Sequence, residues 1–224
     1  MKITYLGHAA FKIESDGKIV FVDPWLGGPT SPAKVNDVNE ADFCLVSHDH
    51  ADHGFNEALD ICKKTGAYFV AINELAIKAK EAGLPNVHTL NIGGSVDIGG
   101  ITITLLQAFH SCGIGAPTGF VVKFPSGSFY HAGDTGVFSS MELFGELYKP
   151  DVILLPIGSY YVMDEIQAAK ATELLKPKVV IPMHYDTFPV ITADTDKFTQ
   201  LVSEKSPEVR IEIMKPGASK ELSF

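Results

Sequence analysis

Cysteine is scarce in this chain of 224 residues, and its pattern excludes a disulfide-stapled fold. The three cysteines, Cys44, Cys62 and Cys112, are odd in number and form no C-x-x-C pair. They lie in apolar or mixed segments, which is typical of reduced thiols in a cytoplasmic protein.

Clusters of basic residues are missing as well. The chain has 18 Lys and Arg against 27 Asp and Glu, a formal net charge of −9. Because no basic stretch is available to follow a phosphate backbone, nucleic acid is an unfavoured partner.

Long apolar runs are the third absence. The runs 151–156 and 179–183 fall far short of the roughly 20 residues that a membrane span requires. Strand-like residues 3–6 follow Met1 and Lys2 at once, which leaves no room for the apolar core of an export signal. We therefore expect no membrane association and a cytoplasmic location.

What is present is a globular composition. Hydrophobic residues make up 46% of the chain and charged residues 20%, which excludes intrinsic disorder. No low-complexity linker divides the sequence. We expect a single domain over residues 1–224.

Two predicted β-hairpins mark the first and second halves of the chain. They are segments 10–15 and 18–22 around Asp16-Gly17, and segments 119–124 and 128–131 around Ser126-Gly127. Such dipeptides suit tight hairpin turns. The likeness of the two hairpins suggests two β-rich halves, each with its own helices.

Helices are predicted between the strands. Residues 56–65 and 73–82 are each followed by a glycine, which often ends a helix. Capping-box patterns begin at Ser139 and Asp164. Strands that alternate with amphipathic helices favour sheets covered by helices on the outside, a layered α/β sandwich. Long connections over 24–41 and 111–118 indicate functional loops.

The densest signal is the run His48-Asp49-His50-Ala51-Asp52-His53, directly after an apolar strand pattern at 43–46. So many potential ligands cannot share one face of a regular helix or strand, so the run predicts a tight loop around a metal. Histidine nitrogen and aspartate oxygen suit zinc, with manganese and iron as alternatives.

Three more candidate ligands follow other strand-like segments. His110 follows residues 101–106, Asp134 follows the second hairpin, and His184 follows residues 179–183. Separate strand ends thus supply the side chains that a metal site would combine.

Further motifs accompany these residues. They are Gly7-His8-Ala9, Asp23-Pro24, Tyr130-His-Ala-Gly-Asp134, Leu155-Pro-Ile-Gly158 and Pro182-Met-His-Tyr185. The set resembles the metallo-β-lactamase superfamily, in particular a branch of small metal-dependent hydrolases related to L-ascorbate-6-phosphate lactonase. The resemblance covers nearly the whole chain. It implies an αββα sandwich, two mixed sheets flanked by helices, with a dinuclear site where the sheets meet.

The resemblance also implies a division of the ligands. One ion would be held by His48, His50 and His110, the other by Asp52, His53 and His184, with Asp134 as the bridge. Two divalent ions, with Zn²⁺ favoured over Mn²⁺ or iron, would lower the pKa of a shared water toward ~7. A metal-bound hydroxide would then attack a small ester-like substrate: a lactone, thioester, amide or phosphate ester. The local charge of about +1 would attract an anionic substrate despite the acidic chain.

Asp52 and His8 are the expected catalytic residues. Asp52 is also a ligand, and the resemblance places the motif around His8 near the site, where the side chain would transfer a proton or contact the substrate. Asp23 and Asp49 are candidates to orient the histidines through their second ring nitrogen.

Other polar residues are not expected to bind metal. His131 would point to the face of its strand opposite Asp134, His88 lies in a polar connection, and Cys112 is interpreted as a loop thiol. Tyr160 and Tyr161 would line either the pocket or the protein core.

Several alternatives remain open at the level of sequence. The chain could instead be a metallonuclease or phosphodiesterase, a redox di-iron protein, or a non-catalytic metal-dependent binding module. The substrate, the metal and a homo-oligomeric state are not determined by the residues.

Overall fold

The computed structural model describes residues 1–224, which form fourteen strands and five helices. The strands of the first sheet are β1 Lys2–Tyr5, β2 Phe11–Ser15, β3 Lys18–Val22, β4 Phe43–Leu45, β5 Tyr68–Ile72, β6 Val87–Leu90 and β14 Ser219–Glu221. Those of the second sheet are β7 Ser95–Ile98, β8 Ile101–Gln107, β9 Thr118–Phe124, β10 Gly127–His131, β11 Val152–Pro156, β12 Val179–Met183 and β13 Arg210–Ile211. The helices are α1 Phe55–Thr65, α2 Asn73–Glu81, α3 Met141–Tyr148, α4 Glu165–Leu175 and α5 Thr195–Lys205, with two 3₁₀ turns, η1 Val35–Asp37 and η2 Ala51–His53.

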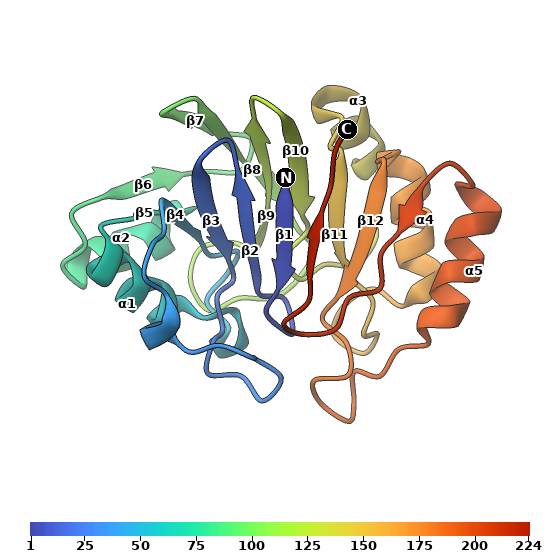
Figure 1. Ribbon diagram of the computed structural model, residues 1–224, viewed down its shortest axis with the longest axis horizontal. Coiled ribbons are helices and arrows are strands. Elements are labelled where there is room, and N and C mark those ends of the chain that lie inside the picture. The colour runs from blue at the N-terminus through green and yellow to red at the C-terminus, as the bar shows by residue number, and fades with distance from the viewer.

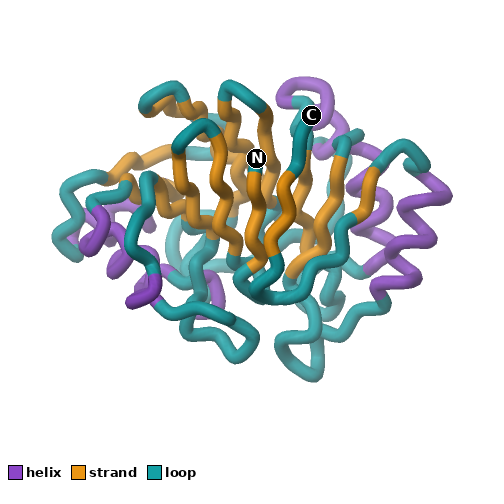
Figure 2. Tube along the Cα trace, viewed as in Figure 1, coloured by secondary structure: helices purple, strands orange, loops and turns teal.

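Two seven-stranded mixed sheets form the centre of the molecule (Figure 1). Their strand orders are β14-β1-β2-β3-β4-β5-β6 and β13-β12-β11-β10-β9-β8-β7. Helices α1 and α2 pack on the first sheet, whereas α3, α4 and α5 form a layer on the second, so the helices flank the sheets (Figure 2). The structure confirms the predicted αββα sandwich. None of its helices has both the length and the apolar character needed to cross a membrane.

The core explains why some strands are apolar throughout and others alternate. In β2, Phe11 and Ile13 are buried while Lys12 and Glu14 are half-buried. In β11, Val152 and Leu154 join a core cluster of 43 residues that includes the space between the sheets, whereas Ile153 and Leu155 join a cluster of 18 residues that packs against α3 to α5. A strand covered on both faces must be apolar at every position.

The two hairpins differ from each other in their turns. Asp16 and Gly17 both have positive φ, 51° and 72°, as the predicted type I′ turn requires. In the second hairpin, Gly127 pairs with Phe124, so the turn residues are Pro125 and Ser126 rather than Ser126 and Gly127.

Three of the four predicted helix boundaries are confirmed. Gly66 ends α1, Gly83 follows α2, and the Asp164 carboxylate caps α4 by accepting from the backbone N–H of Gln167 at 2.8 Å. The capping box at Ser139 is wrong, because α3 begins after Ser140, whose side chain makes no cap hydrogen bond. The helix α5 was not predicted from the sequence.

The cap of α4 gives a stability test. Asp164→Ala removes the carboxylate that accepts from the Gln167 N–H at the α4 N-terminus, so we expect a loss of about 1 kcal/mol in the free energy of unfolding. For a domain of this size the melting temperature would fall by about 2–4 °C. The matched control is Ser140→Ala at the start of α3, for which no change is expected. An equal loss in both variants would contradict the capping role.

Candidate metal centre

The candidate ligands follow strands that run in a common direction. In the first sheet, β2 is antiparallel to both β1 and β3, and β4 is parallel to β3. In the second sheet, β8, β10 and β12 likewise share one direction. The strands that precede the candidate residues are thus β1, β3 and β4 in the first sheet and β8, β10 and β12 in the second. The residues that follow these six strands are His8, Asp23, His48, His110, Asp134 and His184. The ends of these strands lie at one edge of the sandwich, the lower edge in Figure 1. All of these residues except Asp23 belong to groups whose donor atoms lie within 4.8 Å of one another.

The histidine-rich run forms the tight loop that the sequence predicts. It leaves β4, makes the turn η2 and enters α1 through Gly54. Gly54 has φ 68°, and a Cβ at that position would overlap the backbone of Pro24. Glycine therefore permits the close approach that turns the run toward the second sheet.

His48, His50 and His110 form the first group of potential ligands. Their donor atoms all lie within 4.8 Å of one another. The closest pair is His48 Nε2 and His50 Nδ1, 2.9 Å apart. His110 reaches this group from the other sheet, so neither sheet completes it alone.

The second group contains Asp52, His53, His184 and also His8, again with donor atoms within 4.8 Å of one another. His8 Nε2 lies 3.2 Å from Asp52 Oδ2. His8 was expected near the site, and the structure places its ring nitrogen among the potential ligands of this second group.

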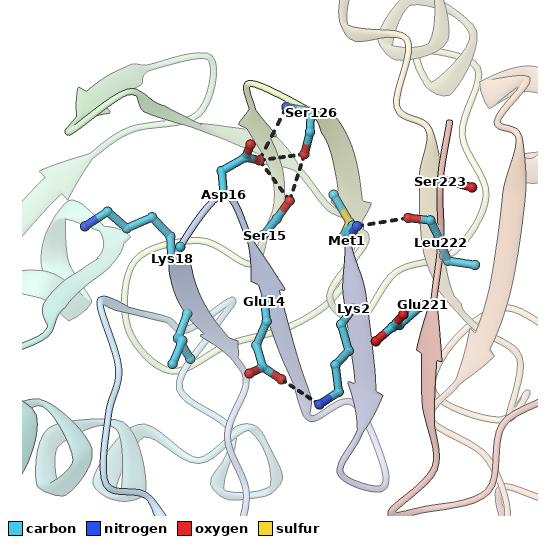
Figure 3. Close-up of a pocket in the computed structure, with 12 residues that line it drawn as sticks. Met1, Lys2, Glu14, Ser15, Asp16, Lys18, Ser126, Glu221, Leu222 and Ser223 are labelled. Atoms are coloured by element: carbon cyan, nitrogen blue, oxygen red, sulfur yellow. Dashed lines mark hydrogen bonds and ion pairs between the residues drawn. The ribbon is translucent and has the colours of Figure 1, made fainter.

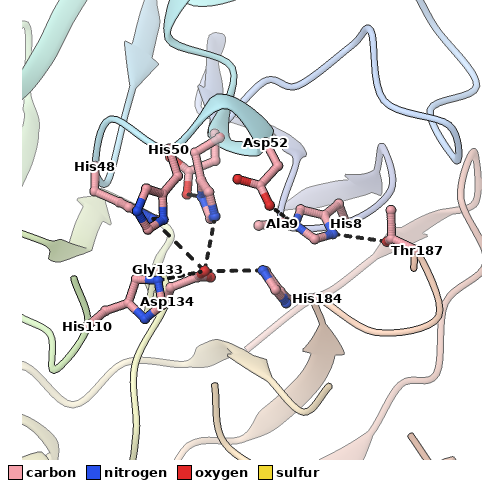
Figure 4. Close-up of polar contacts among 12 residues, drawn as sticks. His8, Ala9, His48, His50, Asp52, His110, Gly133, Asp134, His184 and Thr187 are labelled. Carbon is pink, nitrogen blue, oxygen red and sulfur yellow. Dashed lines mark hydrogen bonds and ion pairs between the residues drawn. The ribbon is translucent and has the colours of Figure 1, made fainter. Parts of the chain in front are cut away.

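Asp134 lies between the two groups (Figure 4). Its Oδ2 is 3.1 Å from His184 Nε2 and 3.3 Å from His53 Nε2 on one side. On the other side it is 3.5 Å from His110 Nε2 and 4.0 Å from His48 Nε2. One carboxylate oxygen thus faces both histidine groups.

Several buried polar atoms of this cluster have no hydrogen-bond partner. They are His53 Nε2, Asp134 Oδ1 and both ring nitrogens of His184. Buried polar groups are nearly always paired, so each exception needs an explanation. A divalent ion supplies one, because neutral imidazole and carboxylate are its usual ligands at about 2.0–2.2 Å. The donor set therefore fits metal ions.

Asp23 contacts the candidate ligand His53 on the side of the ring away from the cluster. Fully buried, its carboxylate accepts from the backbone N–H of Ser47 at 2.7 Å, from Ser47 Oγ at 2.7 Å and from His53 Nδ1 at 2.8 Å. With Nδ1 donating, the lone pair of His53 Nε2 points into the cluster. Ser47 Oγ also lies 3.0 Å from His48 Nδ1. The contact between Asp23 and His53 is the one expected of the predicted orienting residue, and Ser47 contacts both Asp23 and His48.

The buried charges of the site shift the pKa values of its histidines and aspartates. Burial alone would lower the pKa of His53, but the charges of Asp134 and Asp23 outweigh it and raise that pKa well above its usual value. Conversely, burial would raise the pKa of Asp134, yet His53 and His184 hold it well below its usual value. Burial lowers the pKa of His48 to about 2, which keeps its imidazole neutral, as metal binding requires.

Three residues of this edge have strained backbones. His8, Asp23 and His184 have φ of 55°, 44° and 56°, in the left-handed region that favours glycine. The backbone N–H of His184 donates to the carbonyl of His8 at 2.7 Å, which joins the two sheets at this point. Such strain is concentrated at functional sites.

A cavity of about 290 Å³ opens onto the cluster. Its lining residues are His50, Asp52, His110, Ser111, Asp134, Tyr161, His184, Phe188 and Ile191. Tyr161 thus lines the cavity, whereas Tyr160 does not and is exposed.

A larger cavity of about 780 Å³ lies near both chain ends, at the opposite edge of the sandwich (Figures 1 and 3). Its polar groups pair with one another: Asp16 with Ser126, and Lys2 with Glu14. It is open and has no buried polar atom without a partner, so the smaller cavity is the better candidate site.

The remaining predicted residues lie outside the cluster. Asp49 accepts from the backbone N–H of Gly113 at 2.8 Å, so it anchors the 111–118 loop instead of orienting a histidine. His131 is buried and bonded to the Ala9 carbonyl, and it belongs to neither group. His88 lies on β6 rather than in a connection.

Cys112 is absent from both groups, and its Sγ lies 3.4 Å from the carbonyl of Gly115. This agrees with its interpretation as a loop thiol.

Two contacts at the site had no signal in the sequence. Thr187 Oγ1 lies 2.9 Å from His8 Nδ1, and the Phe188 ring lies 5.7 Å from the His8 ring. Both residues are on the loop after His184, and their approach to His8 depends on the loop conformation.

A family model described as a β-lactamase superfamily domain matches residues 2–184. The chain belongs to the metallo-β-lactamase superfamily. This confirms the family resemblance seen in the motifs.

Similar members of the superfamily come from archaea. The chain is 48% identical over 217 residues to a protein of Caldivirga maquilingensis named UPF0173 metal-dependent hydrolase, with 96% of this chain and 95% of that one covered. A Methanopyrus kandleri protein of the same name is 47% identical, with 99% and 100% covered. Among solved structures, a metallo hydrolase of Ignicoccus hospitalis matches with a TM-score of 0.93 and 41% identity, covering 100% of this chain and 98% of that one.

The contacts of Asp23 lead to a second stability test. Asp23→Asn places an amide N–H₂ group where one carboxylate oxygen now accepts hydrogen bonds, so we expect the metal-free protein to lose about 2–4 kcal/mol in urea unfolding. Because His53 loses its fixed orientation, Zn²⁺ affinity should also fall about 10–100-fold in a competition titration.

The matched control is Asp49→Asn, whose half-buried carboxylate accepts one loop N–H. We expect it to change the free energy of unfolding by less than about 1 kcal/mol. If the two variants lose equal stability and affinity, the orienting role of Asp23 is wrong.

Proposed function

We propose that the protein is a dinuclear metal-dependent hydrolase of small ester-like molecules: lactones, thioesters, amides or phosphate esters. The observation that carries the proposal is the position of Asp134 Oδ2 between two histidine groups. The names of the archaeal relatives support the coarser part, a metal-dependent hydrolase.

We assign the ligands in two sets that share one residue. His48, His50 and His110 would hold one ion, Asp52, His53 and His184 the other, and Asp134 would contact both. Two bound divalent ions would lower the pKa of water and polarise the substrate oxygen. Zn²⁺ is the first choice for this donor set, and Mn²⁺ or iron are the alternatives.

Asp52 lines the cavity, and its neighbour His8 would carry the proton. Hydrolysis adds water: its oxygen bonds to the carbonyl carbon or phosphorus, the bond to the leaving atom breaks, and a proton passes to that atom. His8 is suited to carry this proton on Nε2, which lies 3.2 Å from Asp52 Oδ2. Burial lowers the pKa of His8 to about 4, although Asp52 acts in the opposite direction, so the ring starts neutral.

Thr187 and Asp52 would hold His8 in place. The hydroxyl of Thr187 lies 2.9 Å from Nδ1, on the side of the ring away from the cluster. If Nδ1 donates to this hydroxyl, Nε2 gains a proton only when the ring becomes charged, and it would then donate that proton in a hydrogen bond to Asp52 Oδ2. Asp52 therefore serves both as a ligand and as the partner of the proton-carrying histidine.

The alternatives have less support. A nuclease would need lysine and arginine along a nucleic-acid path, and neither residue type lines the cavity. A non-catalytic metal-dependent binding module would have the same cluster as the hydrolase, and only the absence of substrate turnover would distinguish the two. The three free cysteines agree with the proposed cytoplasmic location.

Metal content tests the two-ion assignment. After removal of metal with a chelator and reloading with Zn²⁺ or Mn²⁺, elemental analysis should give two ions per chain. His110→Ala and His184→Ala should each retain about one, because each removes a ligand from a different set. His88→Ala, on an edge strand away from the site, is the control. Fewer than one ion in the unaltered protein would reject the assignment.

The role of His8 is tested with a panel of esters, lactones, thioesters and phosphodiesters. His8→Gln should retain two ions and lower kcat about 100-fold or more, because a positioned proton carrier contributes roughly 10²–10⁴-fold. His88→Gln should leave kcat unchanged. Loss of one ion in His8→Gln would show that His8 is a ligand instead, and metal-dependent turnover of no panel member would favour the binding module.

A further inference from the structure

We propose that the group of the substrate beyond the hydrolysed bond is neutral, apolar and about the size of an aromatic ring. The inference rests on the proposed function and names the substrate class for the same cavity. The inference follows from the residues that line the cavity but are not candidate metal ligands.

Four lining residues of the 290 Å³ cavity are not candidate ligands. They are Ser111, Tyr161, Phe188 and Ile191. Three of these four present aromatic or aliphatic surface, and none of all nine lining residues is lysine or arginine. An anionic group placed against these walls would lose water without gaining a cation, which is unfavourable. An anionic group is therefore accommodated only at the metals.

Phe188 is held on the loop that follows His184. Asp186 N–H donates to the Ile191 carbonyl at 2.8 Å, and Ile191 N–H donates to the Phe188 carbonyl at 3.1 Å, so the loop closes on itself. Thr187 ties it to His8. The Phe188 ring lies edge-on to His8 and 6.0 Å from the Trp25 ring. This wall stands next to the proposed proton carrier.

Tyr161 is held on a second tight turn. Ser159 and Tyr160 both have φ of 57°, and Tyr161 N–H donates to the Ser159 carbonyl at 2.6 Å. Met163 N–H donates to the carbonyl of Thr135, which fixes the turn beside Asp134. The strained turn leaves Tyr161 56% exposed at the cavity instead of in the core. Two separate loops thus hold exposed rings on one cavity, as expected of a site for an apolar ligand.

Acetate esters of different alcohols test the inference by kinetics. Methyl, butyl and benzyl acetate release the same acid and alcohols of similar reactivity. With Zn²⁺-loaded protein we expect kcat/KM to rise at least tenfold from methyl to benzyl acetate, since each buried methylene is worth up to about fourfold. A sulfonate at the para position of benzyl acetate should abolish the gain.

Variants of the wall connect this preference to Phe188. Phe188→Ala should lower the benzyl-to-methyl ratio of kcat/KM at least about fivefold, and Phe188→Leu should restore part of that ratio. The matched control is Phe224→Ala at the opposite edge, because Phe224 is 41% exposed and Phe188 37%. An unchanged ratio in Phe188→Ala would overturn the proposal.

Binding provides a readout that needs no turnover. Trp25 is the single tryptophan of the chain and lies near Phe188. Benzyl alcohol should change its fluorescence in a saturable manner, and 4-(hydroxymethyl)benzenesulfonate should bind at least about tenfold more weakly. Phe188→Ala should weaken benzyl alcohol binding, whereas Phe224→Ala should not.

The two proposals fail in different ways. Absence of ester turnover together with selective benzyl alcohol binding would reject the hydrolase assignment and retain the apolar subsite. Metal-dependent turnover with equal kcat/KM for methyl and benzyl acetate, or with preference for the sulfonated ester, would reject the subsite and retain the hydrolase.

Discussion

The site depends on the pairing of buried charge. Two fully or nearly fully buried carboxylates, Asp23 and Asp134, lie on either side of the buried His53 ring. Removing such groups from water is costly, and the cost is offset only by partners with good geometry. Asp23 obtains three hydrogen bonds from Ser47 and His53. Asp134 obtains its partners from the histidines of both sheets, and its second oxygen has none without an ion.

The common direction of the strands brings the hydrogen-bond partners of Asp23 and Asp134 to the same edge of the molecule. Loops that follow parallel strands of both sheets meet at one edge, which lets residues far apart in sequence converge without long connections. The opposite edge carries the chain ends and an open cavity with self-paired polar groups. The His/Asp cluster and the chain ends therefore occupy separate regions of the molecule.

Much of this could be predicted from the sequence, for identifiable reasons. The histidine-rich run and the residues after apolar segments carry their own chemical signal, and hydrophobic periodicity and turn residues indicated the layered α/β sandwich. The motif resemblance supplied the specific αββα architecture, and the division of the ligands into two sets stays a prediction. Asp164 was recognised as a cap because its carboxylate bonds locally.

What the sequence did not predict depends on contacts between distant segments. Asp49 bonds to the loop at Gly113, and Thr187 approaches His8 across the interface of the sheets. The Ser139 pattern failed because helix α3 starts one residue later than a capping box there would require. Hydrophobic periodicity can be recognised from the spacing of neighbouring residues, whereas the conformation of a loop cannot.

The distribution of the ligands over the two halves has a consequence for assembly. Residues 1–90 contribute His48, His50, Asp52 and His53, and residues beyond 95 contribute His110, Asp134 and His184. Neither half contains either of the proposed ligand sets in full. A cation bound by such a set would connect the two halves, and separating them would release it.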